Sequence, residues 1–290
     1  MDSLEELLNT PIDKLPHVDK IGRWTLIKLE IINEYAKAYS LILNKQPRIS
    51  HVYIDAFSGA GIAIARESGK NVLGSALNAI RIVPPFKKYY FIDTDEDKVQ
   101  FLREATKNRT DVEVIHGDSN KILIDSVFSE VGYTEYKRGL CVFDPYGLHL
   151  HWQTVQAAAE NKAIEIFLNF PLMDMNMNVL WRKNPEGQDP LQIERMNRFW
   201  GDESWRDEVY DTIGDLFGYP SKVFDANKKI AEAFRKRLNE VAGFEFVPEP
   251  IVMRNTSGGE LYYLFFASHN KTGEKIAKHV LKKYRELGRN

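Results

Sequence analysis

The stretch His51–Gly61, with the sequence HVYIDAFSGAG, decides the fold of this chain. An apolar run ends there in Asp55, and a turn of small residues follows it. This pattern predicts a buried strand that leads into a nucleotide-binding loop. Gly59 and Gly61 lack side chains, so the backbone of such a loop can approach a bound cofactor closely.

The same pattern recurs further along the chain, at 89–93 (YYFID), 112–118 (VEVIHGD) and 140–146 (LCVFDPY). Each of these apolar runs also ends in an acid, and another strand is expected over 163–169. Helical patterns separate the strands, which predicts a mostly parallel sheet of the Rossmann-like α/β type with right-handed crossovers. Ligands of such sheets bind beyond the carboxyl ends of the strands.

We expect four parts along the chain. They are an N-terminal helical segment (1–46), a Rossmann-like cofactor-binding core (47–170), a helical insertion or cap (171–245) and C-terminal strands with a helix that complete the core (246–290). The late strands, expected from 246 to 253 and from 261 to 267, should form a hairpin that gives the sheet an antiparallel strand. Residues 62–73 are expected to be a polar loop, either a lid over a ligand or an ordinary exposed connection.

Composition narrows the class of protein. The chain has 290 residues, a formal net charge of -2, 43% hydrophobic residues and one cysteine. These values fit a globular α/β protein without internal disulfides, and Cys141 is expected to be a buried thiol. No apolar run reaches the roughly 20 residues of a membrane span. We therefore expect a cytoplasmic protein with no membrane contact, whose weak net charge disfavours nonspecific binding of polyanions.

The motifs resemble those of class I methyltransferases, which use S-adenosylmethionine. The first loop resembles their F-x-G-x-G motif, Asp93 falls where they bind the ribose hydroxyls, and Gly117-Asp118 resembles their adenine-binding loop. Asp93 also lies further from Gly61 than the roughly 20 residues of a dinucleotide fingerprint, which disfavours a nicotinamide cofactor. The resemblance implies that S-adenosylmethionine is bound by Asp55, Phe57, Ser58, Gly59, Gly61, Asp93 and Asp118.

Asp144-Pro145-Tyr146 resembles the Asp/Asn-Pro-Pro-aromatic turn of methyltransferases that act on the amino groups of nucleic-acid bases. The resemblance implies that Asp144 and a prolyl carbonyl accept hydrogen bonds from the target amine while Tyr146 stacks on the base. This chain has one proline there, followed by Gly147, so a purely structural turn remains the alternative. No metal is predicted, because His149 and His151 have no evident third ligand.

The whole chain is also similar to the three-Cys-motif partner proteins. The similarity is carried by residues 53–61, 74–79, 91–93, 144–147 and 265–270 and by Gly273. It implies a methyltransferase fold and a partner protein bearing a cysteine motif that this chain lacks. Three interpretations stay open: a methyltransferase of DNA or RNA bases, a methyltransferase of a small molecule or protein, and a non-catalytic member of a complex.

Overall fold

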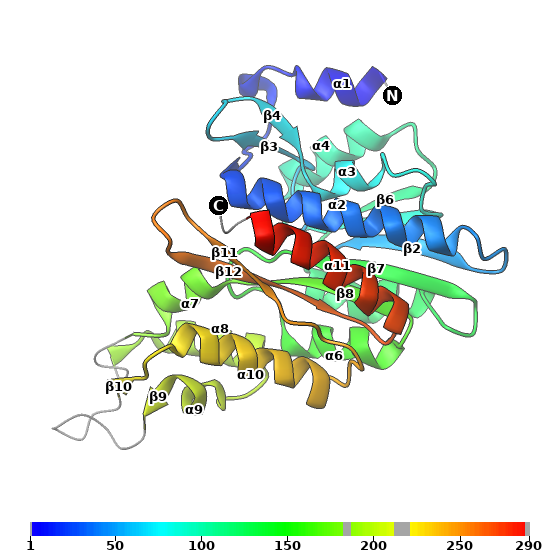
Figure 1. The fold of residues 1–290 in the computed structure, drawn as a ribbon. Helices are drawn as coiled ribbons and strands as arrows, with labels where there is room; N and C mark the ends of the chain where they lie inside the picture. The colour runs from blue at the N-terminus through cyan, green and yellow to red at the C-terminus, as the bar shows by residue number, and fades with distance from the viewer. Residues whose placement is uncertain (1, 182–186, 212–220, 288–290) are drawn as a thin grey trace.

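The computed structural model describes residues 2–181, 187–211 and 221–287. Its centre is a seven-stranded sheet with the order β11-β12-β8-β7-β2-β5-β6 (Figure 1). The strands of this sheet are β2 (Ser50–Asp55), β5 (Lys88–Asp93), β6 (Val112–His116), β7 (Lys137–Phe143), β8 (Ile164–Phe170), β11 (Ile251–Arg254) and β12 (Glu260–Ala267).

The pairing of the strands confirms the predicted fold class. Strands β6, β5, β2, β7 and β8 run parallel to one another, and β12 is antiparallel to both β8 and β11. The expected late hairpin therefore supplies the antiparallel strand. Central strands such as β2 are buried along nearly their whole length, as a parallel sheet covered on both faces requires.

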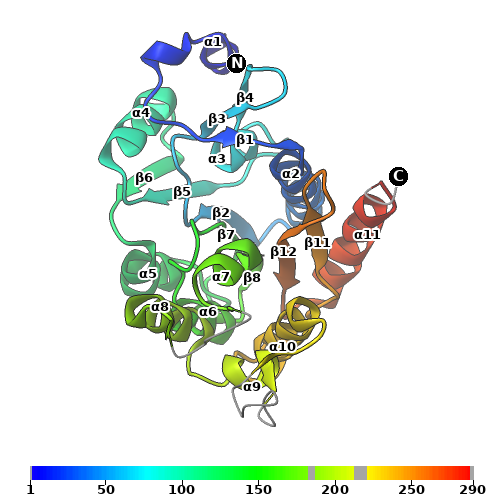
Figure 2. The same cartoon turned by 90° about the vertical axis from the view of Figure 1, so that its left-hand side faces the viewer.

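Helices cover both faces of the sheet (Figure 2). One face packs against α2 (Arg23–Leu43), α3 (Ser75–Ala79), α4 (Glu96–Thr106) and α11 (Lys271–Leu287). The other face packs against α6 (Trp152–Asn161), α8 (Pro190–Trp200) and α10 (Ala226–Glu240). Within the described ranges, no helix is both long and apolar enough to cross a bilayer.

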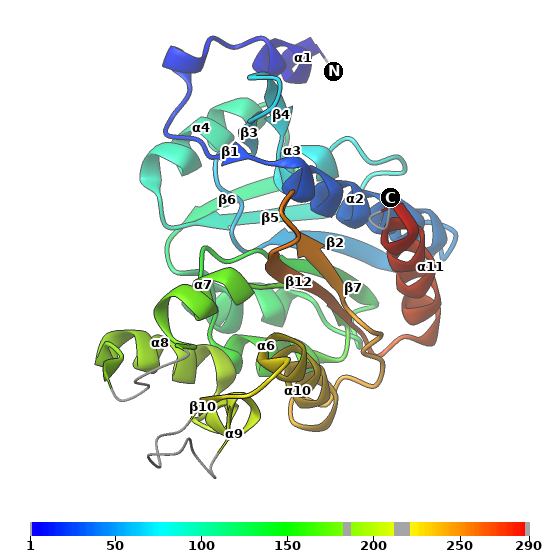
Figure 3. The ribbon, with the colours of Figure 1, turned by 60° about the vertical axis from the view of Figure 1, so that its left-hand side comes forward.

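The region expected to be a helical insertion contains α7 (Leu172–Asn178), α8, α9 (Trp205–Val209) and α10, with a short ribbon of β9 (Tyr210–Asp211) and β10 (Ser221–Lys222). Phe234 of α10 joins it to the sheet, because its ring contacts those of Phe170, Phe199 and Phe265. The insertion thus shares one hydrophobic core with the sheet, and α7 and α10 lie beside the edge formed by β12 and β11 (Figure 3).

Residues 62–73 are not the polar loop that the sequence predicts. They form a hairpin of β3 (Ile62–Ala65) and β4 (Asn71–Leu73), and β3 also pairs with β1 (Lys20–Ile21). All residues of β3 are buried, so the apolar run Ile62–Ala65 forms a strand and only its polar tip is exposed.

Other boundaries also differ from expectation. β11 begins at Ile251 rather than at 246, because Pro248 and Pro250 lack the amide hydrogens that a ladder needs, and only Phe246 bridges to Ser268. The residue pattern over 75–83, which Pro84 and Pro85 follow, also indicates a helix, but in the structure α3 ends at Ala79. The residue pattern around 122–131 also indicates one helix after the third strand, but the structure divides this segment into α5 (Ser119–Ile122), a π-helical turn (Leu123–Val127) and a 3-10 turn (Phe128–Glu130).

Candidate functional site

The carboxyl ends of four neighbouring parallel strands bring the predicted acids to one edge of the sheet. Asp55 ends β2, Asp93 ends β5, and Asp118 and Asp144 lie just beyond β6 and β7. Asp55 lies opposite Phe91 of β5 and Val142 of β7, so Asp93 and Asp144 each follow two residues further along the neighbouring strands. This edge is where open α/β sheets bind ligands.

The loop after β2 is held by Asp93. The backbone N–H of Gly59 donates to Oδ2 of Asp93 over 2.8 Å, and the N–H of Asp95 donates to Oδ1 over 2.9 Å. Gly59 has a φ of 56°, and a Cβ added there would meet no other atom within 4 Å. The loop therefore presents bare backbone to open space.

Gly61 has a different reason to lack a side chain. Its φ is 71°, and an added Cβ would lie 2.8 Å from atoms of both Leu77 and Leu102. Its carbonyl accepts from the N–H of Gly74 over 2.7 Å, which ties the loop to the start of α3. Gly61 lets the loop pack on the helices, whereas Gly59 keeps its outer face open. The buried hydroxyl of Ser58 donates to the carbonyl of Ile92 over 3.2 Å, which fastens the loop to β5.

Asp55 is fully buried beneath this loop. Its Oδ2 accepts from the Ser75 hydroxyl over 2.5 Å, and its Oδ1 accepts a longer bond of 3.4 Å from the N–H of Phe57. Burial raises the pKa of Asp55 to about 7, although the hydrogen bond from Ser75 acts in the opposite direction. The contacts described here support the loop, and a direct contact of Asp55 with a cofactor stays a prediction.

Asp118 caps α5 and remains exposed. Its Oδ1 accepts from the backbone N–H of Asn120 over 2.9 Å and from the Asn120 side chain over 3.0 Å. Asn120 also donates to the carbonyl of His149 over 2.8 Å and accepts from the N–H of His151 over 2.8 Å. This asparagine links the loops after β6 and β7. The sequence analysis missed it, although its place two residues after a predicted site acid is a usable signal.

These residues fit an adenosyl cofactor in two respects that the structure shows directly. The loop at Gly59 leaves open the space that a side chain would occupy, and Oδ2 of Asp118 accepts no hydrogen bond from any described residue. Asp93 is partly exposed and keeps unused acceptor positions, because a carboxylate offers about four. Phe57 is partly buried and packs against the core beside the loop.

Asp144 is held by side chains that lie far from it in sequence. Nζ of Lys28 donates to both of its oxygens, over 2.6 Å and 2.5 Å, and Nδ2 of Asn169 donates to Oδ1 over 2.8 Å. Lys28 is only 4% exposed. These three bonds leave one of the roughly four acceptor positions of the carboxylate, on Oδ2. Asp144 is therefore fixed in place and keeps a single position for a ligand donor.

Sequence analysis missed Lys28 and Asn169. Lys28 comes from α2, where it shares a buried face with Ile31, Ile32 and Tyr35. A lysine in that apolar stripe is a signal, because a buried cation needs an anionic partner. The sequence does not identify that partner as Asp144, which is 116 positions away.

Tyr146 lies beside Asp144 with its side chain open to solvent. It is 83% exposed, whereas Pro145 is buried. No described residue donates to the Pro145 carbonyl. Gly147 has a φ of 62°, and an added Cβ would lie 2.9 Å from Oδ2 of Asp174, so the turn packs closely on α7. The structure therefore brings a fixed acid, a free carbonyl and an open aromatic ring together.

Comparisons with known proteins bear on the fold. No protein-family model matches the chain, and no curated protein matches it in sequence. Among solved structures, it resembles protein LPL1258 of Legionella pneumophila, of family model DUF519, with 12% identity over 88% of this chain and 91% of that one, at a TM-score of 0.50. Weaker likenesses include the methyltransferase domain of bacterial CtHen1, with 12% identity over 82% of this chain and 99% of that domain at a TM-score of 0.38. TYW2 of M. jannaschii, solved with AdoMet, has 11% identity over 84% of this chain and 75% of that one, at a TM-score of 0.34.

Proposed function

We propose that this protein is an S-adenosylmethionine-dependent methyltransferase whose acceptor is the amino group of a nucleic-acid base. The observation that carries the proposal is the pairing of two half-sites at one sheet edge. An open glycine loop fixed by Asp93 lies on one side, and Asp144, fixed by Lys28 and Asn169, lies on the other. Bound cofactor would supply an electrophilic methyl group.

On the cofactor side, Asp93 would accept hydrogen bonds from ribose hydroxyls through the acceptor positions that the loop leaves unused. Asp118 would accept from the adenine amino group through Oδ2. The floor of the cofactor site would be the loop that contains Phe57, Ser58, Gly59 and Gly61. Asp55 supports this loop from beneath. Hydrogen bonds to charged groups contribute about 1.5–3 kcal/mol each, enough for a few carboxylate contacts to define the orientation of a nucleoside.

On the acceptor side, the free position on Oδ2 of Asp144 and the carbonyl of Pro145 would accept the two hydrogens of a target amine. Such bonds direct the nitrogen lone pair toward the methyl group. As the N–C bond forms, the bond from the methyl group to the cofactor sulfur would break, and the proton, acidic only at that stage, would pass to Oδ2 of Asp144 and then to solvent. Orienting the reacting atoms alone can contribute about 7–11 kcal/mol. Lys28 and Asn169 are positioning residues in this scheme, because they prevent Asp144 from turning away.

The open ring of Tyr146 favours a base as the acceptor. Base stacking on an exposed aromatic contributes about 1–3 kcal/mol and accepts any base, since each has a flat face. A single-stranded target avoids the few kcal/mol needed to flip a base out of a duplex. The resemblance to three-Cys-motif partner proteins adds the proposal that a second protein accompanies this chain in the cell.

Transfer of labelled methyl from S-adenosylmethionine to single-stranded RNA and DNA oligonucleotides tests this function. Tyr146→Ala should abolish most of the transfer. Tyr133→Ala is the matched control, because Tyr133 is 60% exposed and precedes β7, at the other end of the strand that leads to Tyr146. Label in proteins or small molecules of a cell extract would move the acceptor to those classes. Cofactor binding without transfer to any of them would identify a non-catalytic member of a complex.

A further inference from the structure

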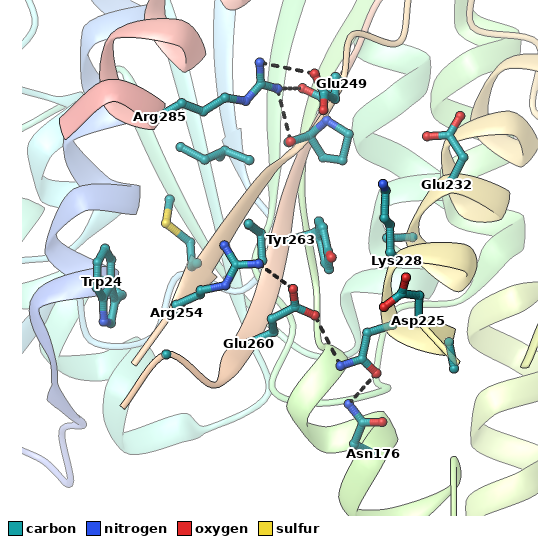
Figure 4. Close-up of a pocket in the computed structure, with 18 of the residues that line it drawn as sticks. Trp24, Asn176, Asp225, Lys228, Glu232, Glu249, Arg254, Glu260, Tyr263 and Arg285 are labelled. Carbon is teal, nitrogen blue, oxygen red and sulfur yellow. Dashed lines mark hydrogen bonds and ion pairs between the residues drawn. The ribbon is translucent and has the colours of Figure 1, made fainter. Parts of the chain in front are cut away.

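A trough runs along the outer edge of the sheet, away from the acid cluster (Figure 4). Its volume is about 970 Å³, and its floor includes the edge strand β11. One wall comes from α10 and the segment before it, and the other comes from α2 and α11. Helices from both faces of the sheet therefore flank the position that an eighth strand would take.

The backbone of β11 has an unused side. β11 is the last strand of the sheet and pairs only with β12. Among the described residues, no backbone group of Ile251–Arg254 bonds to anything outside that ladder. In an antiparallel pair half of the amide and carbonyl groups of an edge strand point outward, and this row is a template for another strand.

The open row is short and has defined ends. At one end, Arg285 donates to the carbonyls of Glu249 and, over 3.1 Å, Pro250. At the other, Arg254 pairs with Glu260 over 2.6 Å, and Glu260 accepts from Asn227 over 3.2 Å. Only Ile251–Arg254 is left for an added strand. At about 3.3 Å per residue, this edge offers roughly 13 Å to a partner.

The walls offer apolar contacts to both sides of an added strand. Trp24 and Ile27 of α2 are partly exposed on one wall. Val223 and Phe224 lie on the other, and Phe224 is 88% exposed. Because successive side chains of a strand point to opposite faces, an occupant with apolar residues could contact both walls.

Charge favours a peptide over a polyanion. The trough is lined by four cations and four acids, namely Lys222, Lys228, Arg254 and Arg285 with Asp225, Glu232, Glu249 and Glu260. Three of the cations are already engaged: Arg254 pairs with Glu260, Arg285 pairs with Glu249, and Lys222 donates to Asn176 and to the carbonyl of Leu180. A surface that binds nucleic acid needs an excess of cations to replace condensed counterions, and this trough has none.

We propose that the trough binds an extended segment of a partner protein, low in net charge and with apolar residues on both faces, which pairs with β11 as an added strand. Neighbouring strands lie about 4.8 Å apart, so a single extended chain beside β11 runs between the two walls. A second folded copy carries the same walls, which would meet these walls before the two strand edges could pair. The proposal does not depend on the methyl-transfer function.

A library of random peptides of about twelve residues, displayed on phage, provides the probe for the full chain. Selected peptides should have alternating apolar residues and slow hydrogen exchange at the backbone amides of 251–254. Lys228→Trp fills the trough from an exposed position of α10 and should weaken binding at least about tenfold. Lys229→Trp is the matched control, since Lys229 is exposed on the same helix but does not line the trough.

Each alternative outcome overturns the proposal. The proposal is wrong if the folded protein enriches no peptide from the library. It is also wrong if Lys228→Trp and Lys229→Trp bind the selected peptides equally well. Unchanged exchange at 251–254 would place the peptide elsewhere. If a poly-uridine oligonucleotide slowed hydrogen exchange at the amides of 251–254, and did not do so in Lys228→Trp, the trough would be a nucleic-acid site instead. Circular dichroism of both variants confirms that they are folded.

Discussion

The two halves of the candidate site are built in different ways. On the cofactor side, Asp93 bonds the backbone of the glycine loop and of Asp95, and Asp118 bonds the backbone next to it. On the acceptor side, Asp144 is held by side chains from α2 and β8. Contacts with nearby backbone predominate in one half, and side chains from distant elements form the other.

This difference predicts which substitutions lower the stability of the fold and which weaken ligand binding. Replacement of Asp93 or Asp118 by alanine removes only one or two hydrogen bonds to nearby backbone amides. Removal of Asp144 would leave the buried Lys28 ammonium without an anionic partner, with the Tyr262 ring 5.1 Å away as a remaining contact, and such charges are costly in a protein interior. We therefore expect changes on the acceptor side to affect folding most, and changes on the cofactor side to affect mainly ligand binding.

The largest expected effect is that of Asp144→Ala. It should lower the free energy of unfolding by up to about 3–5 kcal/mol, because it removes the carboxylate that pairs with the buried Lys28. Asp118→Ala, on the cofactor side, should cost only about 1 kcal/mol, the usual loss for a helix cap. Urea unfolding of both variants measures the contrast.

Adding Lys28→Met to Asp144→Ala serves as the control, since it removes the stranded charge and should restore much of the stability. If Asp144→Ala and Asp118→Ala lose equal stability, the proposed contrast between the two halves is wrong.

A pH effect is expected from Asp55. Burial raises its pKa from 3.8 to about 7, so between these values the folded protein keeps a proton that the unfolded chain has released. This contribution makes the native state less stable as pH rises from about 4 to about 7. Asp55→Asn does not titrate and should gain stability relative to the native protein across that window, by up to a few kcal/mol. Thermal melting at several pH values measures the difference.

Glu165→Gln is the matched control for this effect. Burial also raises the pKa of Glu165 to about 7, but this residue lies within β8 and bonds Tyr35, away from the site. Both variants should show the same trend with pH, and only Asp55→Asn should change cofactor affinity. If Glu165→Gln also changed cofactor affinity, the change in Asp55→Asn could not be assigned to the glycine loop that Asp55 supports.

The third prediction concerns Asp93→Ala. It should weaken S-adenosylmethionine binding by about 1.5–3 kcal/mol, roughly ten- to a hundredfold, because it removes a charged acceptor and the anchor of Gly59. Isothermal titration calorimetry measures it, with Tyr133→Ala, which lies before β7 and away from the predicted cofactor residues, as the control. Unchanged affinity in Asp93→Ala would remove the ribose contact from the account.

The smallest effect on folding is expected for Tyr146→Ala. An exposed ring contributes little to packing, so the free energy of unfolding should change by less than about 0.5 kcal/mol. Cofactor affinity should also stay unchanged, while methyl transfer falls. Loss of stability or of cofactor affinity would show that Tyr146 has a structural role instead.

The sheet could be predicted from the sequence because its signals are local. Apolar runs that end in acids predicted the strands β2, β5, β6 and β7, and the late hairpin predicted the antiparallel strand. The hairpin of β3 and β4 was missed because its polar tip masked two short apolar strands. The start of β11 was misplaced because Pro248 and Pro250 interrupt an otherwise extended segment.

The residues of the site likewise divide into those with local sequence signals and those defined by contacts between distant segments. Asp55, Asp93, Asp118 and Asp144 could be placed at one edge from the motif order, since each ends a strand or lies just beyond one. Lys28, Asn120 and Asn169 could not, because their roles depend on contacts between segments that only the folded chain brings together. The binding roles of the motif residues and the division into four parts remain predictions.

Calorimetric titration of the folded native protein with S-adenosylmethionine, and separately with S-adenosylhomocysteine, tests the central claim most directly. The arrangement of Asp93, Asp118 and the open loop at Gly59 predicts binding of both, with dissociation constants on the order of micromolar. Absence of binding heat with either compound, from protein freed of carried-over ligand, would contradict the assignment of this edge as a cofactor site.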